Sequence, residues 1–92
     1  MIRSFADKAT EQVYFDQFVR AFAGFDRQAR RKLQLLNAAQ SLIDLTVPPG
    51  NRLEPLKGDL AGWHSIRVNS QWRIIFKWQN NDAFNVQIID YH

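Results

Sequence analysis

The chain has 92 residues, of which 46% are hydrophobic and 13% aromatic, so it can form one domain with one modest core. It has no cysteine and two histidines, which excludes disulfides and thiol chemistry and leaves too few ligands for most structural metal sites. The net charge of +3 is mild but compatible with an anionic partner, and we expect no cofactor and no metal. Because no apolar run reaches the roughly 18 residues of a membrane span and no signal peptide is evident, we expect a cytoplasmic protein that does not contact a membrane.

The first quarter of the chain predicts a short strand followed by a helix. Residues Ile2 to Phe5 read as the strand, and Asp7 can cap the helix by accepting hydrogen bonds from the first free amides. Four apolar residues then follow at i, i+3, i+4 and i+7, namely Phe15, Phe18, Val19 and Phe22. This spacing predicts one buried stripe on a helix that ends at Gly24.

A second helix is predicted from Asp26, its candidate cap, to a point before Pro48. Its apolar residues recur at helical spacing and are Ala29, Leu33, Leu36, Ala39 and Ile43. Arg30 and Arg31 belong to a basic cluster on this helix, which either forms a solvated face or contacts a phosphate backbone.

Residues 63–68 and 72–78 alternate in polarity and predict a β-hairpin. A two-residue turn would place Ile66 beside Arg73, whereas a three-residue loop over 69–71 pairs Ile66 with Ile74 and keeps one face apolar. We therefore expect the three-residue loop, which places Arg67 and Arg73 side by side on the face away from the core. Adjacent like charges are unfavourable, so either an anion sits there or the two arginines are solvated.

The final strand is predicted from Phe84 to His92, after a turn at residues 80–82. Strict alternation places Val86, Ile88, Asp90 and His92 on one face. Asp90, Tyr91 and His92 are all able to handle protons, and the alternative is an ordinary frayed terminus. The element order predicts a two-layer α+β domain over residues 1–92, with two helices on one face of an antiparallel sheet.

His64 lies on the apolar face of its strand and reads as a core or rim histidine rather than a catalyst. A triad of Ser65, His64 and an aspartate is excluded because adjacent strand residues point to opposite faces.

Several segments together carry a resemblance to a known family. They are residues 1–5, the run Arg52-Leu53-Glu54-Pro55-Leu56-Lys57-Gly58-Asp59, His64-Ser65-Ile66, Trp72-Arg73-Ile74 and Asp90-Tyr91-His92. In their order and spacing they resemble the HigB toxins of bacterial toxin–antitoxin pairs, a branch of the RelE-like ribonuclease superfamily. The resemblance implies a RelE-like fold with a concave catalytic face and cleavage of mRNA in the decoding site of the 70S ribosome. It also implies a HigA-like helix-turn-helix antitoxin, and contact with operator DNA only through the complex with that antitoxin.

Metal-independent RNA cleavage needs a base for the ribose 2′-hydroxyl, a cation for the phosphorane and an acid for the leaving 5′ oxygen. By resemblance, the family's active-site positions fall on Lys57, Arg73, Asp90, Tyr91 and His92. His92 would be the acid or proton shuttle, with Asp90 orienting it. Arg73 would stabilise the phosphorane with help from Lys57, and Tyr91 would stack on a base or bond the phosphate.

Other residues complete the candidate site. Glu54 stands where familiar relatives carry histidine, so it is either the general base or a solvated acid beside Arg52. The identity of the base therefore stays open. Arg67 and Lys77 are candidate RNA-binding residues on the sheet, and the alternative to an enzyme is a basic module that binds nucleic acid or sequesters a partner without catalysis.

Overall fold

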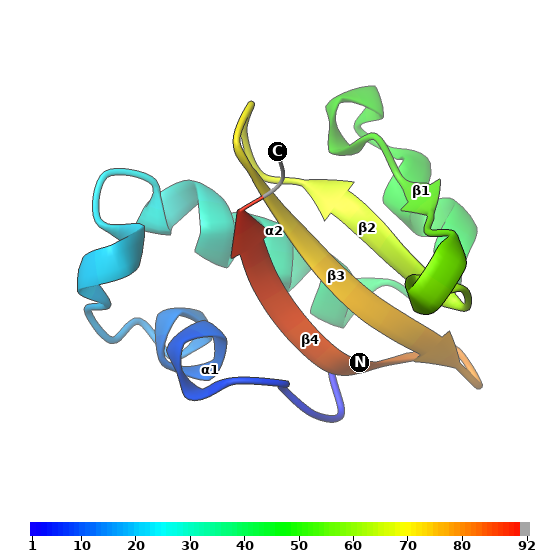
Figure 1. Ribbon diagram of the computed structural model, residues 1–92, viewed down its shortest axis with the longest axis horizontal. Helices are drawn as coiled ribbons and strands as arrows, with labels where there is room; N and C mark the ends of the chain where they lie inside the picture. Colours follow the sequence, from blue (N-terminus) through cyan, green and yellow to red (C-terminus); the bar gives the residue numbers. More distant parts are fainter. Residues whose placement is uncertain (91–92) are drawn as a thin grey trace.

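The computed structural model describes residues 1–90 as two layers, a sheet and a set of helices (Figure 1). Four strands form the sheet in the order β1-β2-β3-β4, all antiparallel: Glu54–Pro55, Trp63–Arg67, Trp72–Gln79 and Asp82–Asp90. The predicted two-layer α+β architecture is confirmed, with β1 as an additional short edge strand. Tyr91 and His92 lie outside the described residues, so their predicted place on the last strand stays a prediction. Within residues 1–90, no helix has the length and apolar character to cross a membrane.

The β2–β3 hairpin has the predicted register. Ile66 pairs with Ile74 and Arg67 with Arg73. The turn over residues 69–71 is closed by the Asn69 side chain, whose Oδ1 accepts hydrogen bonds of 2.8 Å from the backbone amides of Gln71 and Trp72. Because the loop has an odd number of residues, paired residues of the two strands point to the same face of the sheet. Arg67 and Arg73 therefore both lie on the face opposite the core.

The β3–β4 hairpin contains an irregularity that the sequence reading missed. Asn80 and Asn81 form its turn with φ of 51° and 64°, a left-handed conformation that asparagine tolerates. The register then shifts between Ile75 and Lys77, next to Asn85, which has φ of 54°. This bulge places Ala83 and Val86, three positions apart, both in the core. The predicted alternation holds after the bulge, where Val86 and Ile88 are buried and Asp90 shares their face. The bulge interrupts it only between Phe84 and Val86.

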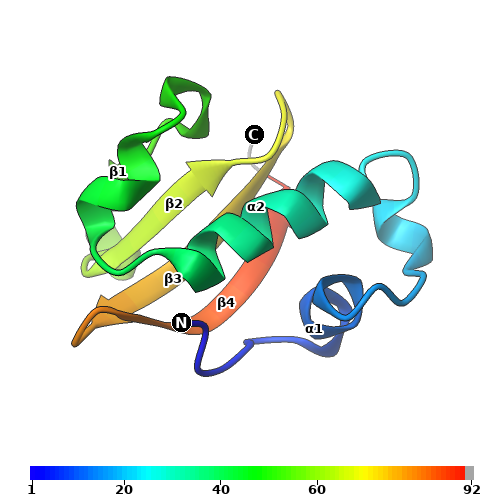
Figure 2. The same ribbon diagram turned by 180° about the vertical axis from the view of Figure 1, so that it is seen from behind.

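The helical layer covers one face of the sheet (Figure 2). Helix α1, Lys8–Tyr14, begins at Asp7, whose Oδ1 accepts from the Thr10 amide at 2.8 Å, as predicted. Helix α2, Asp26–Ala38, turns Ala29, Leu33 and Leu36 toward the sheet. The largest fully buried apolar side chains of the molecule are Val13, Leu33, Leu36, Leu45, Ile66, Ile74, Phe76 and Val86. Each such side chain contributes about 1.5–3 kcal/mol by leaving water.

Both predicted helices are shorter than the apolar spacing suggested. Helix α1 ends at Tyr14, and Phe15 and Phe18 are 61% and 73% exposed, so the predicted buried stripe is wrong for these two. Phe22 is buried, but in a separate 3₁₀ turn, Arg20–Phe22 (η1). Asp16, with φ of 62°, takes a left-handed conformation that a continuous helix does not permit.

Helix α2 ends at Ala38 rather than continuing to Ile43, which is 73% exposed. The chain restarts as a 3₁₀ helix, Leu42–Thr46 (η2), where Asp44 Oδ2 accepts from the backbone amide of Ser41 at 3.2 Å. Asp26 is the first helical residue instead of the cap, because the N-cap position is occupied by Phe25.

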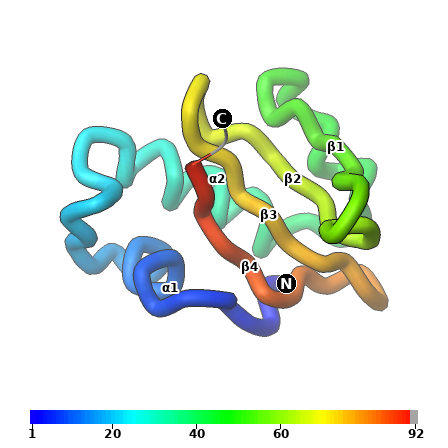
Figure 3. The backbone as a smooth tube through the Cα atoms, in the orientation of Figure 1, coloured from blue at the N-terminus to red at the C-terminus, as the bar shows by residue number. Residues whose placement is uncertain are grey.

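The N-terminal segment runs beside β4, as the tube in Figure 3 shows. Ile2 and Phe5 form isolated parallel bridges with Ala83 and Val86, so the predicted strand over residues 2–5 is reduced to two bridges. The segment nonetheless covers the outer edge of β4, because the backbone amides and carbonyls of Ala83 and Val86 hydrogen-bond to it. Asp82 Oδ2 accepts a hydrogen bond of 3.0 Å from Arg3 Nε. This hydrogen bond lowers the pKa of Asp82, although partial desolvation acts in the opposite direction.

Candidate active site

Arg73 lies near the start of β3, on the sheet face that the helices leave open. Its side chain is only 8% exposed. Nε donates to Ser65 Oγ at 2.9 Å, while Nη2 donates to the carbonyl oxygens of Arg52 at 2.6 Å and Ser65 at 3.4 Å. Nη1 lies 3.9 Å from Glu54 Oε1. These contacts from β1, β2 and the preceding loop fix the guanidinium in one orientation, which is what a preorganised cation requires.

The loop that carries the Arg52 carbonyl is held in place by hydrogen bonds of the neighbouring Asn51. Two 3₁₀ turns, Pro49–Asn51 (η3) and Gly58–Leu60 (η4), flank β1. Asn51 is fully buried, donates to the carbonyls of Leu45 and Val47 at 3.2 and 3.3 Å, and accepts from Lys32 Nζ. Burial, and secondly the charge of Arg31, lower the pKa of Lys32. The loop that carries Arg52 is thus anchored to α2 through a buried amide.

A hollow of about 280 Å³ opens above Arg73, and we call it the arginine pocket. Its lining residues are Arg52, Arg67, Asn69, Ser70 and Arg73. Arg67 Nε donates to the Asn69 carbonyl at 3.0 Å, which holds this second guanidinium against the turn. Three arginine residues line this one hollow, so their positive charge favours an anion there. The planar donor groups of arginine suit the oxygens of a phosphate.

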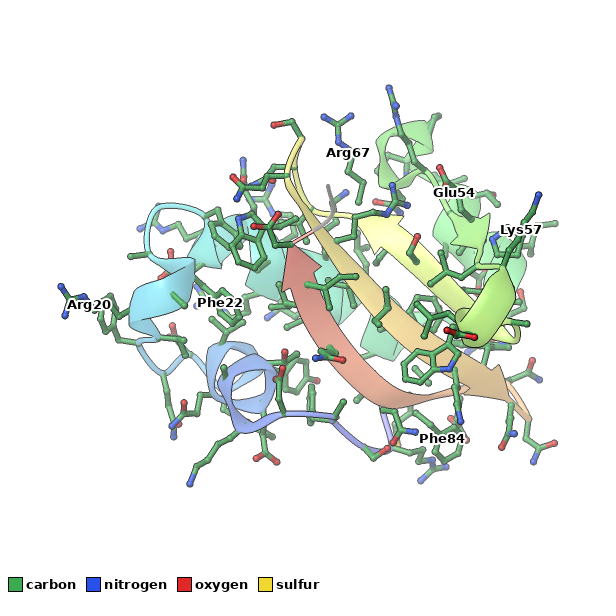
Figure 4. The ribbon with its side chains drawn as sticks, viewed as in Figure 1. Arg20, Phe22, Glu54, Lys57, Arg67 and Phe84 are labelled. Atoms are coloured by element: carbon green, nitrogen blue, oxygen red, sulfur yellow. The ribbon has the colours of Figure 1, made fainter. Side chains whose placement is uncertain are left out.

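Glu54 and Lys57 come from the edge of the sheet (Figure 4). Glu54 pairs with Ser65 across β1 and β2, and its side chain is 49% exposed beside Arg73. The structure therefore brings Glu54 to Arg73, although the sequence had offered Arg52 as its partner. Lys57 is exposed, extends outward at the start of η4 and does not line the arginine pocket.

The remaining predicted RNA-binding residues lie elsewhere. Lys77 is exposed on the open face, four residues along β3 from Arg73. Arg30 and Arg31 lie on α2, in the layer on the other side of the sheet, and Arg30 Nη1 forms a 2.6 Å ion pair with Asp16. The structure does not bring these two arginines to the arginine pocket.

Asp90 ends β4 at the same end of the sheet as the arginine pocket. It pairs with Trp72, and its Oδ2 accepts from Gln71 Nε2 at 3.0 Å. By register it belongs to the face of Trp72 and Ile88, whereas Ile89 shares the open face with Arg73. The predicted catalytic residues Tyr91 and His92 continue from this point, outside the described residues.

Three contributors to the site were not predicted: the Ser65 hydroxyl, the Arg52 carbonyl and the turn residue Asn69. Ser65 could have been found from the register, because it lies diagonally across from Arg73 on the same face. The Arg52 carbonyl carried no sequence signal. No group of three or more histidine, aspartate or glutamate side chains within residues 1–90 is arranged to hold a metal ion.

His64 has the structural position that the sequence suggested. It is half-buried and stacks on Phe76, with ring centroids 6.1 Å apart, while Ser65 points to the opposite face and bonds Arg73. Burial lowers the pKa of the His64 imidazole. The exclusion of a triad through Ser65 and His64 agrees with this geometry.

Comparison with known proteins places this arrangement in a family. The family model described as the RelE-like toxin of type II toxin–antitoxin system HigB matches residues 3–92. The chain belongs to this family. HigB relatives include Toxin HigB-1 of Vibrio cholerae, 44% identical over 90 residues, with 96% of this chain and 95% of the relative covered. Endoribonuclease HigB of Proteus vulgaris is 32% identical over 93 residues, with both chains fully covered.

Solved structures of RelE-like toxins share the fold of this HigB-like chain. YafQ from E. coli superposes with a TM-score of 0.65 at 14% identity, covering 98% of this chain and 93% of YafQ. A YoeB–YefM toxin–antitoxin complex from Staphylococcus aureus gives a TM-score of 0.63 at 18% identity, covering 100% of this chain and 98% of the matched one. At these identities the similarity establishes the fold.

Proposed function

We propose that this HigB-like toxin is an endoribonuclease that cuts mRNA in the decoding site of the 70S ribosome without a metal ion. The observation that carries the proposal is the fixed Arg73 guanidinium at the base of a three-arginine pocket, with the Glu54 carboxylate beside it. The name of the Proteus vulgaris relative, an endoribonuclease, supports the same class of reaction.

The reaction needs three groups around one phosphate. The 2′-hydroxyl oxygen attacks the adjacent phosphorus while a base removes its proton, and the bond from phosphorus to the 5′ oxygen then breaks. An acid supplies the proton that the 5′ oxygen takes up, so the products are a 2′,3′-cyclic phosphate and a 5′-hydroxyl. Acid–base help contributes about 10²–10⁴-fold, and a preorganised charge a comparable factor.

The open face supplies candidates for two of these roles. Arg73 stabilises the phosphorane charge because its orientation is set before the substrate arrives, by Ser65 and the Arg52 carbonyl. Arg67 binds a non-bridging phosphate oxygen from the other side of the pocket. Glu54 is the candidate to take the 2′-hydroxyl proton, since its carboxylate lies 3.9 Å from Arg73 Nη1 and is half exposed to solvent.

The acid is assigned to His92 by the family resemblance. Asp90, whose position beside the turn at residues 69–71 is described, would orient the imidazole, and Tyr91 would stack on a base or bond the phosphate. Lys57 lies farther out and would contact a neighbouring phosphate of the same strand. Within this proposal Arg30 and Arg31 serve no role at the reacting phosphate.

A HigA-like helix-turn-helix antitoxin is the proposed neutralising partner, and operator DNA would be reached only through the complex with it. The family is that of type II toxin–antitoxin systems, and a YoeB relative of the same fold was solved with the antitoxin YefM. Coexpression of the neighbouring helix-turn-helix gene product should restore growth to cells that carry the toxin.

The proposal is tested by controlled expression in bacteria together with mapping of RNA ends. Growth should stop within minutes, and translated messages should carry new 5′-hydroxyl ends that untranslated RNA lacks. His92→Ala should abolish both effects while circular dichroism shows an intact fold. Arrested growth with intact messages would instead indicate a module that binds without cutting, and equal cutting by wild type and His92→Ala would remove His92 from the reaction.

A further inference from the structure

A second cluster lies on the open face at the end away from the arginine pocket. The register places Trp63, Lys77 and Phe84 in one row across β2, β3 and β4. Lys77 is exposed, and its Nζ lies 5.3 Å from the ring centroid of Trp63. Figure 4 shows Phe84 at one end of the sheet and Arg67 at the other. We call Trp63, Lys77 and Phe84 the aromatic row.

The residues of the aromatic row are not part of the hydrophobic core. Trp63 and Phe84 are half-buried, and neither belongs to the residues packed in or against the core cluster. Aromatic rings left partly exposed on an open sheet face, with a lysine between them, differ from the polar residues that a solvated face favours. Their chemistry is that of a site for a flat ligand that carries negative charge.

Single-stranded RNA has this chemistry. Proteins that bind unpaired strands stack bases on aromatic side chains and follow the backbone with cations, and sheet faces are a common platform for such contacts. The aromatic row and Arg73 share one face, and four residues of strand separate them by ~13 Å. An RNA strand whose phosphate sits in the arginine pocket can therefore extend along the open face to the row.

From this arrangement we infer that the aromatic row is a stacking subsite for an unpaired base of the strand held in the arginine pocket. Lys77 contacts the adjoining phosphate, and Trp63 and Phe84 provide apolar surface for the base. The inference rests on the proposed function, because it takes RNA to be the ligand of the arginine pocket. It adds a contact site that the cleavage chemistry does not require.

Binding measurements test the subsite apart from cleavage. Labelled 2′-O-methyl oligonucleotides of increasing length cannot be cut, because the attacking hydroxyl is blocked, and fluorescence anisotropy gives their affinities for the full chain. Affinity should rise about tenfold once the strand is long enough to span both sites. Trp63→Ala should lose that rise, whereas the conservative Trp63→Phe should keep most of it.

Two further variants separate the contributions. Phe18→Ala is the matched control, because Phe18 is a highly exposed aromatic residue in the helical layer, and it should bind every length like the wild type. Arg67→Gln should weaken short and long strands alike, since Arg67 lines the arginine pocket. Melting temperatures confirm that each variant is folded, and Phe84→Leu repeats the test if Trp63→Ala is not.

The outcomes distinguish the subsite from the proposed function. Unchanged length dependence in folded Trp63→Ala or Phe84→Leu overturns the subsite, even when the wild type cuts messages. Loss of antitoxin binding with unchanged oligonucleotide binding also overturns it and assigns the row to a protein interface. A wild type that shows the length-dependent step but cuts no message during translation keeps the subsite and overturns the proposed cleavage.

Discussion

The two faces of strand β3 have opposite tasks. Ile74 and Phe76 are fully buried against α2 and its neighbours, whereas Arg73 and Lys77 lie on the face without helices. Adjacent side chains of a strand point in opposite directions, so one strand supplies both the core and the candidate active site. The difference teaches that substitutions on one face should change stability, and those on the other should change RNA cleavage.

The largest expected loss of stability is on the core face. Phe76→Ala leaves a cavity among buried neighbours and should lower the free energy of unfolding by about 3–5 kcal/mol. Its matched control is Lys77→Ala, one residue along the strand, which should change that free energy by less than about 0.5 kcal/mol. Denaturant titration measures both. Equal losses would show that the two faces are not separate in their effects.

Glu54→Gln tests the proposed base with little change in shape. If the carboxylate takes the 2′-hydroxyl proton, the rate of message cleavage should fall by about 10²–10⁴-fold. Because the side chain is half exposed, the melting temperature should remain close to that of the wild type. A cleavage rate that stays near the wild-type value would assign the base role to another group.

Ser65→Ala should moderately lower both the stability of the fold and the rate of cleavage. It removes the hydroxyl that accepts from Arg73 Nε at 2.9 Å, which should cost about 1 kcal/mol of stability. The guanidinium then gains freedom, and cleavage should slow by roughly tenfold because its orientation is less defined. Unchanged cleavage would mean that the Arg52 carbonyl alone is sufficient to position Arg73.

The smallest effect is a pH dependence at His64. Burial disfavours the charged imidazole, so its pKa in the folded protein lies below the ordinary 6.5. Above pH 6.5 both states are neutral, and below it the unfolded chain takes up a proton first, so stability declines as the pH falls. The free energy of unfolding at pH 7.5 and 5.5 should differ less in His64→Phe than in the wild type. The same pH-dependent difference in His64→Phe and in the wild type would contradict the lowered pKa of His64.

The parts of the fold that follow local rules were predictable. The three-residue turn followed from parity alone, because an even turn would have mixed charged and apolar residues on one face. The pairing of Arg67 with Arg73 came with it. The Asp7 cap was readable because aspartate before a helix bonds its first amides.

The parts that depend on distant contacts were not predictable. Helix α1 stops before Phe15 where Asp16 turns left-handed, and Asp16 is paired with Arg30 of α2. The bulge next to Asn85 and the Arg52 carbonyl are likewise set by tertiary packing. The break of α2 did have a local signal, since serine followed three residues later by aspartate marks a new helical start at Ser41 and Asp44.

The central claim is that the arginine pocket of the open face holds the phosphate that is cut. Arg73→Gln and Arg31→Gln remove the same charge from opposite layers of the molecule, and their rates of message cleavage in a translating extract can be compared directly. We predict a loss of about 10²–10³-fold for Arg73→Gln, with a folded protein by circular dichroism, and a change of less than about twofold for Arg31→Gln. Equal rates for the two variants, or a greater loss for Arg31→Gln, would contradict the account.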